Sequence, residues 1–400
     1  MVSVGIDVAK DKSTVCILRP YGEILRSPFE VPHDDTAVKA LIVELMEMGG
    51  ELRIVMEATG VYHLPLLQQL KAAGFFVSVI NPLAMKRYAA SEIRKAKTDK
   101  LDTLRIANYG IDHWFRLEDY QAPEAIYEEL RVLGRQYYQY NRMNTQCKLR
   151  LNHMLDRTMP GLRALFGASY AQVRGKDKLC DFVSTYWHYE SITKMSEAKF
   201  IQSYNAWAKK KGYRAKEEKA KTIYALARSG IPTLPSNLSS TKMLVQEAVN
   251  AIQVVNSILF RILSQMQELA KQLPEYAVVR SMAGVGEILA PCLMAEIGDV
   301  RRFSHSKSLV AYAGIDAPPF QSGTFKGSRR TISKRGSPVL RKVGYEAMQC
   351  LKRNKPTEDN TVYLYILKKE AEGKPKKVAK IAGLNKFLRI YYARVSALYA

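Results

Sequence analysis

The chain begins with short apolar runs separated by turn residues. Apolar residues dominate Val2–Val8 and Ser13–Leu18, and Tyr21-Gly22 forms a turn into a third run, Glu23–Phe29. Short apolar runs bounded in this way are typical of β-strands. The pattern therefore predicts a β-meander at the start of the fold.

Helical and strand patterns alternate after this meander. Apolar residues recur at helical spacing over Asp34–Met48 and Tyr62–Ala73, and buried strands are predicted at Leu52–Met56 and Phe75–Ile80. Such alternation predicts an α/β domain. Three strands followed by alternating helix and strand also resemble the ribonuclease-H-like order, which we expect for residues 1–122.

Pro123 marks a change to long helical patterns. Residues 124–157 lack proline and contain one glycine, Gly134, and a second long apolar pattern covers residues 238–273. Between them lies an insert, residues 160–236, with a basic stretch at Lys209–Lys221. Two long helices predict an antiparallel hairpin or a dimerising coiled coil, and simple packing in one helical domain fits equally well. We expect residues 123–274 to form this long-helix, coiled-coil middle.

Residues 275–400 are predicted to form a third, mainly helical domain. Two apolar helical patterns flank Gly284-Val285-Gly286, as in a helix-hairpin-helix. Glycines allow a backbone to approach phosphates, and the next helix offers its N-terminal amides to an anion. Gly284 and Gly286 are therefore predicted to bind nucleic acid, with a tight helix turn as the alternative. The fold class is α/β plus all-α.

Charge follows the same division of the chain. The formal net charge is +23, made up of −1 in residues 1–122, +8 in 123–300 and +16 in 301–400. This balance favours a polyanionic partner such as nucleic acid over a merely soluble basic protein. The chain has five cysteines and no CxxC pair, which disfavours a zinc site or disulfide framework. It also has no run of about 18 apolar residues, so no membrane span is predicted. We expect a reduced, cytoplasmic protein with no membrane partner.

Four acidic residues stand at positions that a sheet edge can bring together. Asp7 ends the first strand, Glu57 follows the core of another, and Asp99 and Asp102 share one face of a predicted helical turn. Clustered carboxylates repel one another unless a cation lies between them, and magnesium prefers such oxygen ligands. Two ions can activate a nucleophile and stabilise a leaving oxygen. Taken singly, each acid also fits a turn, cap or surface role.

Several motifs resemble those of the DEDD transposases of the "one-ten" insertion-sequence family. The similar segments are Val4–Lys10, Glu57–Tyr62, Val79–Pro82 and Lys97–Asp102. Members of this family have an RuvC-like N-terminal domain, a coiled-coil middle and a C-terminal transposase domain. The resemblance implies that Asp7, Glu57, Asp99 and Asp102 are the catalytic, Mg²⁺-binding set.

A candidate nucleophile lies in the basic C-terminal segment. A serine in a basic loop is able to attack a phosphodiester, and the residues alone rank Ser328, Ser333 and Ser337 almost as high as Ser322. The last two also fit helix caps before Pro338. The family's nucleophile is the serine of an aromatic-x-Ser-Gly motif, which implies Ser322. Nearby cations predicted to bind phosphates, rather than to form a solvated basic face, are Arg329, Arg330, Lys334, Arg335, Arg341 and Lys342.

The resemblance also implies a function and partners. It implies a transposase that cuts and rejoins DNA at element ends and target, guided by a structured RNA. Acids and serine come from different protomers in the family, which implies a dimer or tetramer. One alternative is an actin-like kinase or ATPase, although Val8-Ala9-Lys10 lacks the Gly-Thr phosphate turn of that class. The other is a non-catalytic nucleic-acid-binding protein on the same fold.

Overall fold

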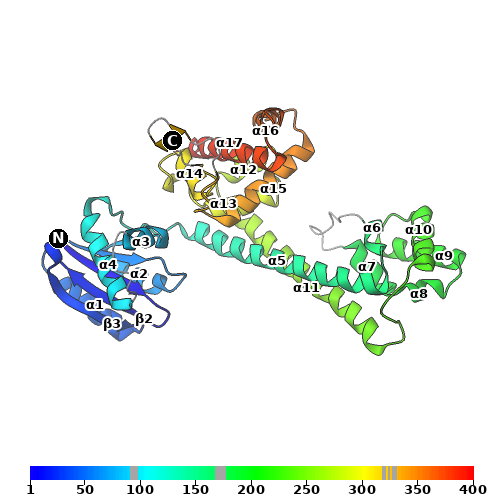
Figure 1. Ribbon diagram of the computed structural model, residues 1–400, viewed down its shortest axis with the longest axis horizontal. Coiled ribbons are helices and arrows are strands. Elements are labelled where there is room, and N and C mark those ends of the chain that lie inside the picture. Colours follow the sequence, from blue (N-terminus) through cyan, green and yellow to red (C-terminus); the bar gives the residue numbers. More distant parts are fainter. Residues whose placement is uncertain (91–97, 167–176, 318–320, 323–324, 327–330) are drawn as a thin grey trace. The chain divides into compact units, whose positions relative to one another are not determined.

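The computed structural model describes residues 1–90, 98–166, 177–317, 321–322, 325–326 and 331–400. The chain forms two compact units, Met1–Ala122 and Pro123–Ala400 (Figure 1). The division of the second unit into a middle and a C-terminal domain stays a prediction.

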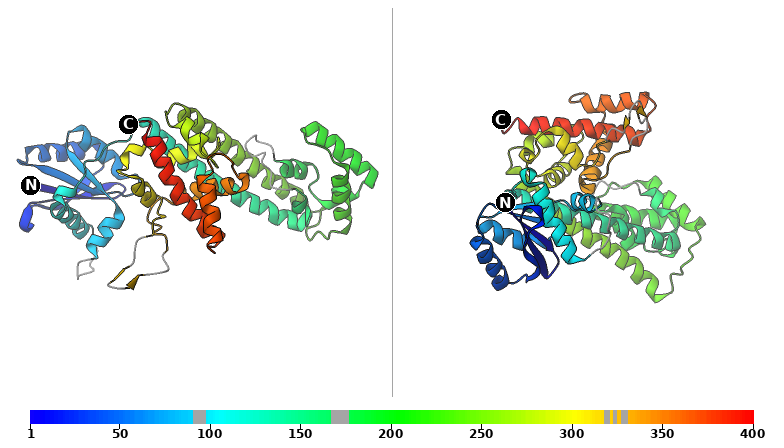
Figure 2. Two further views of the ribbon diagram at one scale, coloured as in Figure 1. Left: turned by 90° about the horizontal axis from the view of Figure 1, so that it is seen from above. Right: turned by 60° about the vertical axis from the view of Figure 1, so that its left-hand side comes forward.

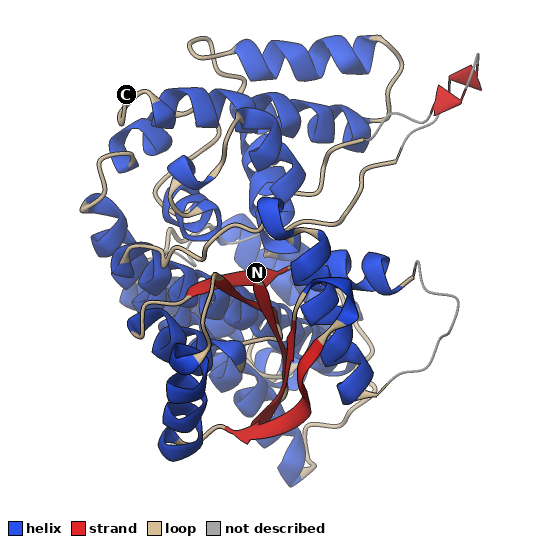
Figure 3. Cartoon of the chain, turned by 90° about the vertical axis from the view of Figure 1, so that its left-hand side faces the viewer, coloured by secondary structure: helices blue, strands red, loops and turns tan. Residues whose placement is uncertain are grey.

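The first unit is built on a five-stranded mixed sheet (Figure 3). Its strands are β1 (Val2–Val8), β2 (Lys12–Leu18), β3 (Ile24–Pro32), β4 (Leu52–Glu57) and β5 (Phe76–Ile80). The spatial order is β3-β2-β1-β4-β5, with β1 to β3 antiparallel and with β4 parallel to both β1 and β5. The predicted meander and the α/β class of this region are confirmed.

Helices cover both faces of this sheet. They are α1 (Asp35–Glu47), α2 (His63–Ala72), α3 (Pro82–Ala89) and α4 (Asp99–Asp112). Alternate residues of β1 and β4, including Ile6 and Met56, are buried in a core with α1 and α2. The residues between them face the other way, where Val55 packs with Ile106 of α4. Along each of these strands, side chains that face α4 therefore alternate with side chains that face α1 and α2.

The second unit is mainly helical within its described residues. Its helices are α5 (Ala125–Thr158), α6 (Leu162–Leu165), α7 (Lys178–Thr185), α8 (Tyr189–Thr193), α9 (Glu197–Lys211), α10 (Glu217–Ser229), α11 (Ser239–Lys271), α12 (Tyr276–Ser281), α13 (Leu289–Ile297), α14 (Ser306–Tyr312), α15 (Pro338–Asn354), α16 (Thr361–Ala371) and α17 (Lys376–Ser396). Two short strands, β6 (Gln321–Ser322) and β7 (Phe325–Lys326), form a separate pair.

The helices α5 and α11 pack as an antiparallel hairpin, one of the predicted alternatives (Figure 2). Buried residues of α11 recur at steps of four and three, the heptad pattern of a coiled-coil seam. The residues of this repeat are Val245, Val249, Ile252, Asn256, Leu259, Leu263, Met266 and Ala270, and Thr241, Val255 and Leu269 of α11 are buried as well. Helix α11 is also long and apolar enough to cross a membrane, a criterion that core helices of soluble proteins meet as well.

Separate apolar cores lie at the two ends of this hairpin. At one end Leu130 of α5 and Met266 of α11 join the core of α12 to α17. At the other end Leu155 and Val249 join the aromatic-rich core of α6 to α10. The insert predicted from the sequence is therefore a packed helical body at one end of the hairpin, and the C-terminal helices pack at the other.

A buried asparagine pair interrupts the apolar seam between these cores. Asn144 Nδ2 donates to Asn256 Oδ1 at 2.5 Å, and both side chains are buried. A polar pair at a seam position fixes the register of two helices, because any slip leaves both amides without partners.

Replacing one member of this pair is expected to cost more than replacing both. Asn144→Leu leaves the Asn256 amide buried without its partner, which lowers the free energy of unfolding by about 1–3 kcal/mol. The double variant Asn144→Leu/Asn256→Leu removes both polar groups and is expected to recover most of that loss. Urea unfolding followed by circular dichroism measures both. The two amides do not act as a pair if the double variant loses as much free energy of unfolding as Asn144→Leu and Asn256→Leu lose together.

Candidate active site

Helix α4 lies directly on β1, backbone against backbone. A Cβ atom at Gly5 would lie 2.4 Å from the Ala107 amide nitrogen and 2.6 Å from the Thr103 carbonyl oxygen. Ser3 Oγ donates to the Ala107 carbonyl at 2.8 Å. Only glycine permits such close approach at position 5. The motif residue Gly5 therefore sets the distance between the helix and the strand.

The contacts also give the direction of α4. Ala107 lies against Ser3 and Gly5, near the start of β1. One turn earlier in α4, Thr103 Oγ1 lies 3.5 Å from the Thr14 carbonyl, and Thr14 is the register partner of Asp7. Helix and strand therefore run in opposite directions. The first turn of α4 lies toward the end of β1 that carries Asp7.

Glu57 reaches the same edge from the neighbouring strand. Strands β1 and β4 are parallel, with Ile6 level with Met56, so Glu57 follows at the level of Asp7. Ile6 and Met56 point into the core with α1 and α2, and alternation turns the next residues to the opposite face. Asp7 and Glu57, both half-buried, thus lie on the face that α4 covers.

The first turn of α4 supplies the remaining two acids. Thr98 Oγ1 accepts from the Leu101 amide at 3.3 Å and caps the helix. Asp99 is exposed, whereas Asp102 is half-buried and accepts from Arg105 Nη1 at 2.8 Å. The structure therefore places the four predicted acids around one edge of the sheet. Arg105 was not predicted, although its spacing of three from Asp102 is a signal for such an ion pair.

This donor set suits magnesium in its chemistry. Carboxylate oxygens are the hard ligands that magnesium prefers, and the positive N-terminal end of α4 favours negative charge there. Within the described ranges, however, no three His, Cys, Asp or Glu side chains lie close enough together to hold a metal ion. In this arrangement Arg105 is the cation beside Asp102. The metal-binding role of the four acids stays a prediction.

Two family models match the chain. Residues 4–160 match a family of DEDD-type IS110 proteins described as transposases, and residues 276–363 match the transposase IS116/IS110/IS902 family. The first match contains all four acids and the second contains Ser322, and together they span more than half of the chain. The protein is an IS110-family transposase. The family predicted from its motifs is therefore confirmed.

Full-length relatives agree with this assignment. The insertion element IS110 uncharacterized 43.6 kDa protein of Streptomyces coelicolor is 22% identical, with 100% of this chain and 93% of that protein aligned. The IS116 44.8 kDa protein of Streptomyces clavuligerus is 24% identical over 92% and 88%. The pilin gene-inverting protein of Moraxella bovis is 21% identical over 98% and 94%. Because these alignments cover nearly the whole chain, they include the helical insert.

A solved structure of Thermus thermophilus RuvC with a Holliday junction substrate is similar to part of this transposase. It is 14% identical and covers 29% of this chain and 96% of RuvC, with a TM-score of 0.23. A score this low adds no weight, and the mixed sheet order described above defines the fold of the first unit.

The candidate nucleophile lies in a small hairpin of the second unit. Ser322 pairs with Phe325 across β6 and β7. The aromatic motif residue Phe320 and the cations Arg329 and Arg330 fall outside the described residues. At the base of the segment that contains this hairpin, backbone amides of Ser333 and Ser337 donate to carbonyls of Asp316 and Tyr312 at 2.8 and 2.7 Å. These two bonds join the two flanks of the segment.

Ser333 and Ser337 hold structural hydrogen bonds, whereas the third competing serine, Ser328, falls outside the described residues. Ser333 Oγ donates to the Asp316 carboxylate. Ser337 Oγ donates to Glu296 at 2.5 Å and accepts from the Leu340 amide at 3.0 Å, so it caps α15. The predicted cap at Ser337 is confirmed. These contacts explain both serines without a catalytic role.

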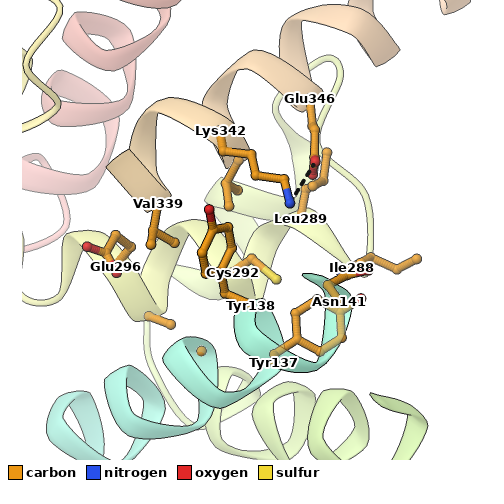
Figure 4. Close-up of a pocket in the computed structure, with 13 residues that line it drawn as sticks. Tyr137, Tyr138, Asn141, Ile288, Leu289, Cys292, Glu296, Val339, Lys342 and Glu346 are labelled. Atoms are coloured by element: carbon orange, nitrogen blue, oxygen red, sulfur yellow. Dashed lines mark ion pairs between the residues drawn. The ribbon is translucent and has the colours of Figure 1, made fainter. Parts of the chain in front are cut away.

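The predicted phosphate-binding cations fall into two groups. Lys334 and Arg335 are exposed. Arg341 Nη1, in contrast, donates to the carbonyls of Ala313 and Gly336 at 3.0 and 3.1 Å and so braces the hairpin base. Lys342 lies 4.0 Å from Glu346, the pair that Figure 4 marks. Phosphate binding by these residues stays a prediction, but Arg341 has a structural role.

Figure 4 shows the pocket into which Lys342 points. This cavity of about 50 Å³ lies among α5, α13 and α15. The Lys342 ammonium lies 4.7 Å from the centre of the Tyr138 ring, and burial raises the pKa of the neighbouring Glu346 carboxyl. Lys342 is therefore held by a carboxylate and an aromatic face within the protein.

The two glycines of the predicted helix-hairpin-helix lie between α12 and α13. Gly284 has a φ of +85°, and a Cβ there would lie 2.7 Å from the Ala347 carbonyl oxygen of α15. Tight packing thus explains this glycine, in agreement with the alternative prediction of a tight helix turn. Gly286 faces open space. Nucleic-acid contact by either glycine stays a prediction.

An ion pair between a buried carboxylate and an exposed arginine, which the sequence did not reveal, joins α5 to the C-terminal helices. Glu296 of α13 is 3% exposed and accepts two bonds from Arg135 of α5, at 2.8 and 2.7 Å. The same carboxylate accepts from Ser337 at the start of α15. Three elements are therefore held by one carboxylate. Its partners are 161 and 41 residues away, so no local spacing signals the contact.

A methyl group at Gly5 is expected to disturb the candidate active site. Gly5→Ala forces α4 away from β1, which lowers the free energy of unfolding by about 1–3 kcal/mol. Gly49→Ala is the matched control, because a Cβ there meets nothing within 4 Å. Thermal unfolding of both variants measures the difference. Equal stability of the two variants contradicts the close packing described here.

Proposed function

We propose that this transposase cuts and rejoins DNA with Asp7, Glu57, Asp99 and Asp102 as its metal-binding acids and Ser322 as its nucleophile. The observation that carries the proposal is the alignment of β1, β4 and the first turn of α4, which brings the four acids to one sheet edge. Structural acids have no need to share an edge, whereas a metal site requires it.

The proposed reaction is two successive transesterifications. The Ser322 hydroxyl loses its proton and forms a bond to a DNA phosphorus, while the bridging oxygen of the cut strand leaves and takes up a proton. A hydroxyl of the second DNA strand then attacks the phosphoserine and releases Ser322. Magnesium, when bound, supplies positive charge that stabilises the phosphate oxygens. Asp102 would be one of the residues that hold the cation, and Arg105, which donates to Asp102 at 2.8 Å, would then be available to contact the phosphate.

The contacts of the second unit support Ser322 over Ser333 and Ser337. Ser333 and Ser337 are engaged with Asp316 and Glu296, and their bonds hold the base of the hairpin. Ser322 lies in β6, paired with Phe325 of β7, within the segment whose flanks these bonds hold.

The family's wider properties complete the proposal. We propose a cytoplasmic enzyme that acts on element ends and target DNA, is guided by a structured RNA, and works as a dimer or tetramer with acids and serine from different protomers. The name of the Moraxella bovis relative adds DNA inversion as a possible outcome of the same strand exchange. Family membership favours this function over an actin-like kinase.

A denaturing gel tests the nucleophile and the acids together. Wild type, incubated with labelled element-end DNA, its co-purifying RNA and magnesium, is expected to form a covalent protein–DNA adduct. Ser322→Ala is expected to form none, and Asp7→Asn to form it at least about 100-fold more slowly. Ser333→Ala and the exposed Asp11→Asn are the matched controls and are expected to retain the adduct.

Three results would overturn parts of this proposal. An adduct that persists in Ser322→Ala assigns the nucleophile to another residue. No adduct with wild type under conditions where it binds DNA supports the non-catalytic alternative. Recombination without any specific RNA rejects guidance while leaving the strand chemistry intact.

A further inference from the structure

The helical insert carries a dense positive charge that the proposed chemistry does not use. Residues 160–236 contain 14 Lys and Arg against 6 Asp and Glu, so the insert accounts for a net charge of +8. Its helices α6 to α10 surround an aromatic core that includes Phe182, Phe200 and Tyr204. The charge is therefore displayed on a packed body.

Three lysines of this body lie at the starts of α7 and α10. Lys178 opens α7, Lys216 precedes α10, and Lys219 lies in its first turn. Lys178 Nζ donates to the Arg214 carbonyl at 3.4 Å and lies 5.1 Å from the centre of the Tyr213 ring. These contacts hold Lys178 beside the loop that leads into α10.

An aromatic ring positions Lys219 in the same way. Its ammonium lies 4.2 Å from the centre of the Phe166 ring, and its side chain is half-buried. Burial, followed by the positive charges of Lys178 and Lys216, lowers the pKa of Lys219. Burial and the charge of Lys216 lower the pKa of Lys178. The three ammonium groups are thus close enough to repel one another.

The neighbouring carboxylates are committed to other partners. Asp177 accepts from the Leu179 and Cys180 amides at the start of α7. Asp181 accepts from Tyr213 Oη at 2.6 Å and lies 3.4 Å from Lys211. Glu217 and Glu218 pair with Lys221.

These described carboxylates therefore give the three lysines no ion-pair partner. In the part of the chain that the structure describes, none of them forms an ion pair. The adjoining sequence 167–176 contains no Asp or Glu. Such mutual repulsion is relieved by an external anion that lies among the three ammonium groups.

We propose that Lys178, Lys216 and Lys219, the lysine cluster, bind phosphate groups of a nucleic-acid backbone and make the insert a second nucleic-acid-binding surface. Phosphodiesters are favoured over acidic protein because the chain belongs to a transposase family, whose substrate is DNA. Lysine ammonium groups bind backbone phosphates without reading sequence. The proposal goes beyond the cleavage chemistry and does not depend on which residues cut DNA.

Binding by full-length variants tests this surface directly. The cluster variant is Lys178→Gln/Lys216→Gln/Lys219→Gln. Its matched control, Lys194→Gln/Lys199→Gln/Arg228→Gln, removes the same charge from exposed residues of the same insert. None of these control residues is among the charges that act on Lys178 or Lys219. Fluorescence anisotropy with labelled duplex DNA and with a labelled RNA hairpin gives the affinity at several salt concentrations.

The expected result is a local loss of phosphate contacts. The cluster variant should bind about tenfold more weakly at physiological salt, and its slope of log affinity against log salt should fall by about 2–3 for duplex DNA. The control should change that slope by less than about one. A loss confined to DNA or to RNA identifies which nucleic acid supplies the phosphates.

Other outcomes would overturn the proposal. If the cluster variant and the control lose equal affinity for nucleic acid, only the overall charge matters. If the cluster variant binds DNA and RNA as wild type does, the lysine cluster is not a binding site. Labelled polyglutamate, measured in the same way, is the probe for acidic protein. If the cluster variant loses binding to polyglutamate but not to DNA or RNA, the surface binds acidic protein instead. If the cluster variant unfolds, the charge-preserving Lys178→Arg/Lys216→Arg/Lys219→Arg variant replaces it, and weakened binding by that folded variant contradicts a backbone-phosphate surface.

Discussion

The contact of α4 with β1 is the constraint on which the candidate active site depends. At Gly5 the helix and strand backbones are so close that no side chain fits between them. Because the two elements run in opposite directions, the same contact carries the first turn of α4 to the end of β1. Parallel pairing of β4 with β1 then brings Glu57 level with Asp7. One glycine and one strand register thus determine where four acids stand.

A different kind of constraint holds the second unit. There the hairpin of α5 and α11 joins two cores, and its register is fixed by the buried Asn144–Asn256 bond. Glu296 connects α5 with α13 and the start of α15, next to the clamped base of the Ser322 hairpin. Breaking the three hydrogen bonds of a buried carboxylate is costly, so this network keeps the hairpin base in one place.

Local patterns were sufficient to predict the main elements. The strands and the two long helices lie within one to a few residues of their predicted bounds, because apolar periodicity reports directly on which face is buried. The convergence of the acids was predictable in part, since Asp99 and Asp102 share one helical turn and the two other acids end strands. Long-range contacts were not predictable. Gly284 and Arg341 both suggested phosphate binding from their sequence context, and only their tertiary neighbours show that they pack and brace α15 and the hairpin base.

Manganese binding, measured by electron paramagnetic resonance on the full-length chain, tests most directly whether the four acids form one metal site. We expect Asp7→Asn, on the strand, and Asp102→Asn, on the helix, each to weaken manganese binding severalfold or more, because the proposed site contains both carboxylates. Asp35→Asn, in a surface ion pair with Lys39, should leave binding unchanged. Loss of binding in the strand variant with full binding in the helix variant would contradict a shared site at this sheet edge.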